Sequence, residues 1–154
     1  MNVLLINGSP HAHGCTDAAL QEIAKALNAD GIETTIYYIG AVPVGGCVGC
    51  GAGRLLAQKP AAIVTSARRA GTTSALEALE KVPQFCQMPL ISSTYWPMVH
   101  GSNAEQAALD EEGMQIMRNL GHNMAWILKC IAAGKAAGIE PPKAENTIRT
   151  NFIR

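Results

Sequence analysis

The first forty residues follow a strand, helix and strand pattern. Residues 3–6 form a continuous apolar run, which is typical of a strand buried on both faces of a parallel sheet. Apolar residues then recur at helical spacing over 18–27, and residues 33–39 alternate as a second strand. The pattern therefore predicts a right-handed crossover unit in a parallel α/β sheet.

The rest of the chain predicts two more strands and two more helices. We expect strands over 61–66 and 90–94, with a short helix over 74–81 between them. A long helix is predicted to begin at Asn103, with Gln106 as its capping partner. We expect His122 and Trp126 on that helix to be packing residues, and Gly113 and Gly121 to let another backbone approach closely, as an oligomer interface would require.

The polar loop between the first strand and the first helix is the main candidate site. It carries Gly8 and Gly14 and no large apolar side chain. Such a turn aims the unpaired N–H groups of a helix start, with the positive end of the helix dipole, at a point where an anion is favoured. Ser9 and Thr16 add hydroxyl groups, although Thr16 is also a good residue for capping the helix alone.

Three familiar phosphate loops do not match this sequence. No lysine follows Gly14, as a nucleotide P-loop requires, and Pro10 interrupts the spacing of a dinucleotide-binding glycine motif. A phosphatase loop would need arginine where Gln21 stands, so Cys15 is not favoured as a nucleophile.

Composition points to one neutral domain. About half of the 154 residues are apolar, which suits a single core, and we expect one domain over 1–154. Twelve basic residues balance twelve acidic ones, so charge gives no broad case for nucleic acid or an anionic membrane as partner. The chain opens without a basic or long apolar leader, and we expect a cytoplasmic protein. Five cysteines, an odd number, favour thiols over a disulfide framework.

The first loop resembles the Gly-Ser-Pro-x-x-x-Gly-x-Thr loop that holds the flavin phosphate in the flavodoxin-like, NAD(P)H-dependent FMN reductase family. Further similar stretches are 67–73, Tyr95-Trp96 and 110–113. The resemblance implies a flavodoxin-like three-layer α/β sandwich with a parallel sheet of order 2-1-3-4-5. The family often has arginine where His11 stands and asparagine where Cys15 stands, so this chain departs from it at two side chains of the loop.

The resemblance implies FMN as cofactor, NAD(P)H as co-substrate and two cofactor-binding loops. The second loop follows the strand over 61–66, at the strand end where ligands bind in open α/β sheets. An alternative for its arginines is a solvated turn that pairs with Glu77 or Glu80. The implied cofactor-binding residues are Ser9, His11, Gly14, Cys15, Thr16, Arg68, Arg69, Ala70, Gly71 and Thr72. No side chain has a clear acid or base role, so no catalytic residue is named.

The implied activity is hydride transfer from the nicotinamide to FMN and on to a second acceptor, either a small molecule or a redox protein. The resemblance also suggests a homodimer or homotetramer. A non-enzymatic electron carrier is one alternative, although such flavodoxins usually carry strong negative charge. An iron–sulfur flavoprotein using Cys47 and Cys50 is another, but two thiolates are not four ligands, and Cys86 and Cys130 offer no matching second pair.

The number of elements is too small for the implied fold. About twenty residues separate Ile39 from Ala61, too few for a crossover, a strand and a return helix. We therefore predict that the third strand is absent and that roughly forty residues are missing near 51–55, either from this sequence alone or, alternatively, by a deletion in the protein itself. Since that strand lies between the first and the fourth, its absence would split the sheet.

Four residues after the strand over 90–94 are a third candidate group. Tyr95, Trp96, Met98 and His100 are expected at the carboxyl edge of the sheet, where they could line a flavin or nicotinamide pocket. A subunit contact and plain core packing are the alternatives.

Overall fold

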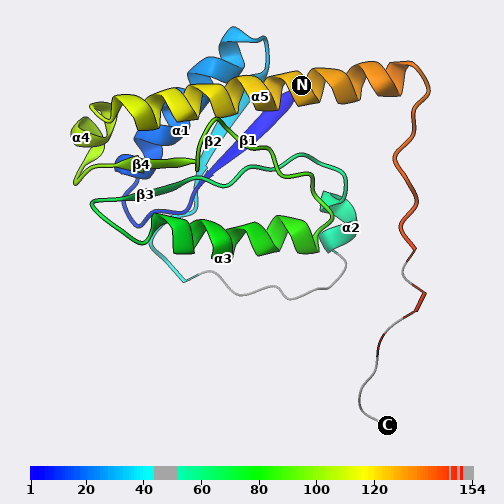
Figure 1. Cartoon of the computed structure of the whole chain (residues 1–154), viewed down its shortest axis with the longest axis horizontal. Coiled ribbons are helices and arrows are strands. Elements are labelled where there is room, and N and C mark those ends of the chain that lie inside the picture. Colours follow the sequence, from blue (N-terminus) through cyan, green and yellow to red (C-terminus); the bar gives the residue numbers. More distant parts are fainter. Residues whose placement is uncertain (44–51, 146, 149, 151–154) are drawn as a thin grey trace.

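A computed structural model describes residues 1–43, 52–145, 147–148 and 150 of the chain. In chain order the elements are β1 (Asn2–Asn7), α1 (Cys15–Ala29), β2 (Glu33–Tyr38), α2 (Ala52–Leu56), β3 (Thr65–Ala67), α3 (Thr72–Phe85), β4 (Met98–His100), α4 (Ala104–Ala108) and α5 (Glu111–Ala136). Figure 1 shows the strands between α5 on one side and α3 on the other. The predicted α/β class with parallel strands is confirmed.

The first forty residues form the predicted crossover unit. β1 and β2 pair in parallel from Asn2 opposite Glu33 to Asn7 opposite Tyr38. Between them α1 buries its apolar stripe, which includes Leu20, Ile23 and Leu27. The helix ends because Gly31 adopts a left-handed φ of 79°. The Ile32 amide then donates a hydrogen bond of 2.9 Å to the Leu27 carbonyl.

The described strands form two separate sheets, β1 with β2 and β3 with β4. The predicted single sheet of order 2-1-3-4-5 is therefore not seen within the described residues. The expectation that β1 is buried on both faces is also wrong, because Leu5 is 8% exposed whereas its neighbours Leu4 and Ile6 are 58% and 56% exposed. Of the stretch where we predicted a missing segment, residue 51 lies outside the described residues and Ala52–Leu56 forms α2.

The strand predicted over 90–94 is shorter and displaced. Leu90 makes a single bridge to Ala61, and continuous pairing resumes at Met98, opposite Thr65, and runs to His100, opposite Ala67. The carboxyl edge of this sheet therefore lies at His100. Tyr95 and Trp96 come before that edge, so their predicted place at it is wrong.

α5 packs along α1 and closes the main core. Met117, Leu120 and Met124 of α5 are buried in one cluster with the apolar stripe of α1. Gly121 allows this close packing, because a Cβ there would lie 2.7 Å from the Cβ of Ala26. The predicted close approach at Gly121 is confirmed, but it serves a contact within the chain.

The predicted long helix is interrupted after one turn. Asn103 caps α4, where its Oδ1 accepts the Gln106 amide at 2.9 Å, as expected. A second helix, α5, then begins with Asp110 as its N-cap. None of the helices in the described part of the chain is long and apolar enough to cross a membrane.

Candidate functional site

The loop after β1 is held in shape by Asn7. This residue is fully buried at the end of β1, its Nδ2 donates to the Ala12 carbonyl at 3.0 Å, and its Oδ1 accepts the Ser9 amide at 3.0 Å. The Ser9 hydroxyl oxygen accepts the His11 amide at 3.1 Å, which leaves the hydroxyl hydrogen of Ser9 free to donate. Hydrogen bonds within the loop therefore define its shape.

The loop leads into an open helix start. Gly14 is the N-cap of α1, and no side chain caps this end of the helix. A Cβ at Gly14 would lie 3.2 Å from the His11 Cβ, so the tightly folded loop favours glycine here. The amides of the first turn of α1 are thus directed at the loop with the positive end of the helix dipole behind them, as an anion site requires.

Thr16 does not cap α1, contrary to one of its predicted roles. It lies in the first turn, and its hydroxyl shares a hydrogen bond of 2.9 Å with the Ser66 hydroxyl at the end of β3. Since a hydroxyl both donates and accepts, one hydrogen of the pair remains available to a ligand. The contact brings the first loop against the carboxyl end of β3, as predicted for the two loops.

The second loop presents its backbone and its arginines rather than a threonine hydroxyl. Arg68 and Arg69 are exposed and make no ion pair within the described residues, so the alternative, a pairing with glutamates of α3, is not seen there. Gly71, the N-cap of α3, has a φ of 95°, and no side chain caps this helix start either. Thr72 is buried and its hydroxyl donates to the Met98 sulfur at 3.2 Å, which leaves its backbone N–H as its possible contribution.

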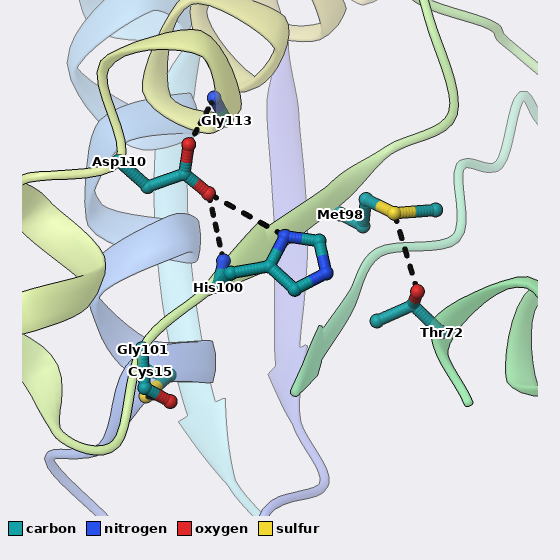
Figure 2. Close-up of polar contacts among 7 residues, drawn as sticks. All are labelled: Cys15, Thr72, Met98, His100, Gly101, Asp110 and Gly113. Atoms are coloured by element: carbon teal, nitrogen blue, oxygen red, sulfur yellow. Dashed lines mark hydrogen bonds and ion pairs between the residues drawn. The ribbon is translucent and has the colours of Figure 1, made fainter. Parts of the chain in front are cut away.

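A third loop, after β4, joins the site. Figure 2 shows the Cys15 thiol beside Gly101; it donates to the Gly101 carbonyl at 3.3 Å and to the Asn103 carbonyl at 3.2 Å. The Gly101 amide in turn donates to the Ala67 carbonyl at 3.2 Å. Cys15, which departs from the family loop, thus links the first loop to the third.

Asp110 fixes the far side of the third loop. Its Oδ2 accepts the His100 amide at 2.7 Å and lies 3.7 Å from the His100 Nδ1, while its Oδ1 accepts the Gly113 amide at 2.9 Å (Figure 2). Gly113 is needed because a Cβ there would lie 2.5 Å from the Asp110 carboxylate. The group close to Gly113 is thus the side chain of its own helix cap, and the prediction that another backbone approaches this glycine is wrong.

Sequence reasoning missed several residues that build this site. Asn7 could have been found as the polar residue that ends an apolar run, whereas Asp110 was noted only as part of the stretch 110–113 and not as a partner of the His100 amide. Ser66 carried no local signal, because its partner Thr16 is fifty residues away. Cys47 and Cys50 lie outside the described residues, within which no cluster of three potential metal ligands occurs.

The described residues form an α/β protein in which an uncapped helix start and two exposed arginines lie at the carboxyl ends of parallel strands. Residues 1–51 match the family described as NADPH-dependent FMN reductase. The match supports the predicted resemblance to the flavodoxin-like NAD(P)H-dependent FMN reductase family. Members of that family use FMN as cofactor and NAD(P)H as co-substrate. It covers the first third of the chain, including β1, α1 and the loop between them. A search of curated proteins found no match.

The residues present fit the phosphate end of FMN. A phosphate group needs several N–H and O–H donors in a small concave loop. The loop over 8–16 offers the open first turn of α1, the free hydrogen of the Ser9 hydroxyl and a glycine where a Cβ would crowd the fold. The two arginines of the second loop add positive charge near the same edge.

Proposed function

We propose that the protein is an FMN-dependent NAD(P)H oxidoreductase that passes electrons from the nicotinamide through FMN to a second acceptor. The family match implies an oxidoreductase of this kind. One observation carries the proposal: the matched segment contains the whole loop over 8–16, with its uncapped helix start. The acceptor is either a small molecule or a redox protein.

Each loop has a separate task in this proposal. The first turn of α1 and the Ser9 hydroxyl hold the phosphate, while Thr16 and His11 lie beside it. The backbone of Ala70 and Gly71 lies along the ring of the cofactor, and the guanidinium groups of Arg68 and Arg69 stabilise negative charge that develops there. Bound FMN supplies the hydride and electron chemistry, so no protein side chain is required as acid or base.

We also propose that the chain is a single flavodoxin-like domain, of strand order 2-1-3-4-5 and three layers, that lacks its third strand. The two separate sheets and the exposed outer face of β1 support this proposal, because a missing strand between β1 and β3 leaves that arrangement. Intact-mass measurement of the protein from its native source tests it. A mass above 16.2 kDa by the mass of roughly forty residues locates the segment in the natural protein, whereas a mass of 16.2 kDa indicates a true deletion.

FMN titration tests the cofactor assignment. Since a Cβ at Gly14 would lie 3.2 Å from His11, Gly14→Ala should distort the loop and weaken FMN binding by about tenfold or more, corresponding to about 1.4 kcal/mol. Gly53→Ala is the matched control, because nothing lies within 4 Å of its added Cβ. Quenching of flavin fluorescence measures both affinities. Equal affinities for Gly14→Ala and Gly53→Ala, or no binding by the unaltered protein, would contradict the assignment.

A second measurement separates the enzyme from the alternatives. The enzyme should bleach bound FMN rapidly when mixed with NADH or NADPH in a stopped-flow instrument, whereas an electron carrier binds FMN without rapid reduction. Iron analysis of the purified protein addresses the iron–sulfur alternative, which depends on Cys47 and Cys50. Stoichiometric iron and sulfide would replace the simple reductase with an iron–sulfur flavoprotein.

A further inference from the structure

His100 is the last residue of β4, at the edge where the second and third loops meet. It pairs in register with Ala67, the last residue of β3, so it lies beside the start of the second loop at Arg68. The Gly101 amide donates to the Ala67 carbonyl at 3.2 Å and continues this contact beyond the strand. His100 is therefore a neighbour of the loop to which the proposed function assigns the ring of the cofactor.

Strand alternation places the side chain of His100 on the same side as the end of the second loop. Val99 is fully buried in the core, so its neighbours Met98 and His100 point to the opposite face of β4. On that face the Met98 sulfur accepts the hydroxyl of Thr72, the first residue of α3, at 3.2 Å (Figure 2). The imidazole ring thus extends from the face of β4 that contacts the residue after Gly71.

Asp110 holds the backbone of His100 and leaves its ring nitrogens open. The Oδ2 atom of Asp110 accepts the His100 amide at 2.7 Å but lies 3.7 Å from Nδ1, which is longer than a hydrogen bond. Among the described residues neither ring nitrogen makes a hydrogen bond, and the side chain of His100 is 41% exposed. Any residue except proline could donate the same amide, so the imidazole itself is not needed to hold the strand end.

The loops and helices around β4 supply other charged and titratable groups. The second loop contributes Arg68 and Arg69, which are exposed. The others at this edge are His11 and His13 of the first loop, Cys15 and Asp17 of α1, Glu105 of α4, and Asp110, Glu111 and Glu112 where α5 begins. Within the described part of the chain, Asp110 is the one acidic group at ion-pair distance from the His100 ring. Arginine keeps its charge near neutral pH, so His100 is the residue beside the second loop whose charge can change there.

We propose that His100 tunes the cofactor: its protonated ring stabilises the negative charge of reduced FMN and thereby makes the reduction potential depend on pH. The inference rests on the proposed function, in which the ring of the cofactor lies along the second loop. A hydride carries two electrons and one proton, so its transfer leaves one negative charge on the ring. No proton leaves His100 in this proposal, because the imidazolium acts through its charge alone.

Spectroelectrochemical titration of the FMN-loaded protein tests the proposal. At about pH 6, His100→Gln should favour reduced FMN about tenfold less than the unaltered protein, which is a potential ~30 mV lower for a two-electron couple. At about pH 8.5 both side chains are neutral, so the two potentials should converge. His100→Lys keeps a positive charge throughout, so its potential should lie above that of His100→Gln at both pH values.

His122→Gln is the matched control, because His122 also contacts an aspartate but lies near the other end of α1. Its Nδ1 is 2.7 Å from the Asp30 carboxylate, just after the end of α1. His122 is exposed, as is Trp126 one turn further along α5, so the packing roles predicted for both are wrong. The potential of His122→Gln should equal that of the unaltered protein at both pH values.

Two results would overturn the proposal. One is a potential of His100→Gln that equals the potential of the unaltered protein at both pH values. The other is a potential lowered by the same amount at both, or restored by no lysine at this position, since either would show that the charge of His100 is not involved. Circular dichroism checks that each variant is folded.

FMN binding separates this inference from the proposed function. His100→Gln should bind oxidised FMN within about threefold of the unaltered protein, because the oxidised ring carries no charge for the imidazolium to stabilise. If the unaltered protein binds no FMN, the proposed function fails and this inference fails with it. If the unaltered protein binds FMN and is reduced by NAD(P)H, but its potential equals that of His100→Gln, this inference alone fails.

Discussion

At the scale of single residues, Asn7 holds the first loop of the candidate site through two side-chain hydrogen bonds. Its amide is fully buried and both ends are hydrogen-bonded to the loop, so Asn7→Ala leaves the Ser9 amide and the Ala12 carbonyl without these partners. We expect a loss of about 1–3 kcal/mol in the free energy of unfolding, because an unpaired buried polar group costs that much. Urea unfolding measures it.

Asn2→Ala provides the control for Asn7. Asn2 lies at the other end of β1 and is exposed, so its replacement should change the free energy of unfolding by less than about 0.5 kcal/mol. Asn7→Asp retains the acceptor for the Ser9 amide but loses the donor to Ala12, so an intermediate loss is expected. Equal stability of Asn7→Ala and Asn2→Ala would show that the loop does not depend on Asn7.

Hydroxyl partners were the least predictable residue-scale feature. The sequence identifies Ser9 and Thr16 as donors near a phosphate, but Thr16 bonds Ser66 and Thr72 bonds Met98. Both partners come from other elements, and local spacing contains no information about them. The glycines were more predictable, since Gly14 is constrained by its own loop.

At the scale of elements, the contact between α1 and α5 depends on Gly121. A Cβ at this position would lie 2.7 Å from the Ala26 Cβ and 3.0 Å from the Ile23 carbonyl oxygen. Gly121→Ala should therefore push the helices apart and cost about 1–3 kcal/mol despite the better helix propensity of alanine. Thermal or urea unfolding provides the measurement.

Gly134→Ala on the same helix isolates the packing effect. Its added Cβ would meet Ile139 at 3.8 Å, an ordinary contact, so the substitution should stabilise by up to about 1 kcal/mol through helix propensity. Opposite signs for the two glycine variants are expected. If both stabilise the protein, α1 and α5 are not in the close contact described.

Ion pairs across the same helix contact make stability depend on pH. The hydrogen bond from Arg118 is the main cause that lowers the pKa of Glu22 below its ordinary value of 4.5, with Lys25 adding to it. His122 similarly lowers the pKa of Asp30 below 3.8. Because the folded pKa is depressed, this stability is present above the ordinary pKa values and is lost as the pH falls below them.

Glu22→Gln tests the pH dependence. The variant should be less stable than the unaltered protein at neutral pH, by up to about 1 kcal/mol, since an ion pair near the surface contributes little more. Below about pH 4.5 the difference should shrink, because the unaltered protein then loses the same interaction. Glu33→Gln on exposed β2 is the control. A difference that stays constant down to about pH 3 would show that the charge of Glu22 is not involved.

Elements with local patterns were predictable, and those set by tertiary contacts were not. Helical spacing and a glycine stop predict α1 closely, and alternation predicts β2. The strand predicted over 90–94 instead pairs mainly at Met98–His100. Asn119 and Asn123 of α5 hydrogen-bond to Thr94 and Ser92, which lie before the paired residues. The apolar pattern of residues 90–94 contains no information about contacts with a helix that begins only at Glu111.

At the scale of the whole molecule, the described strands are divided between two sheets. A parallel strand normally needs cover on both faces, yet the described elements cover mainly one face of β1, with α1 and α5 on that side. Length and element count predicted this division from the sequence, since the chain between β2 and β3 is too short for another strand and its helix. What the sequence could not reveal was how β3 would lie, because a contact that places it, between Ser66 and Thr16, joins residues fifty positions apart.

Neighbouring leucines of β1 test that division directly. Leu5 is 8% exposed and packs in the core, whereas Leu4 is 58% exposed on the opposite face. In the 154-residue protein Leu5→Ala should cost about 2–5 kcal/mol, and Leu4→Ala less than about 1 kcal/mol, because only the first creates a cavity. If the natural protein carries the additional strand and helix, Leu4→Ala in that longer chain should become nearly as costly as Leu5→Ala, since both faces of β1 are then covered. Equal costs already in the 154-residue chain would mean that β1 is enclosed on both faces without any further segment, and the proposal of a missing central strand would fail.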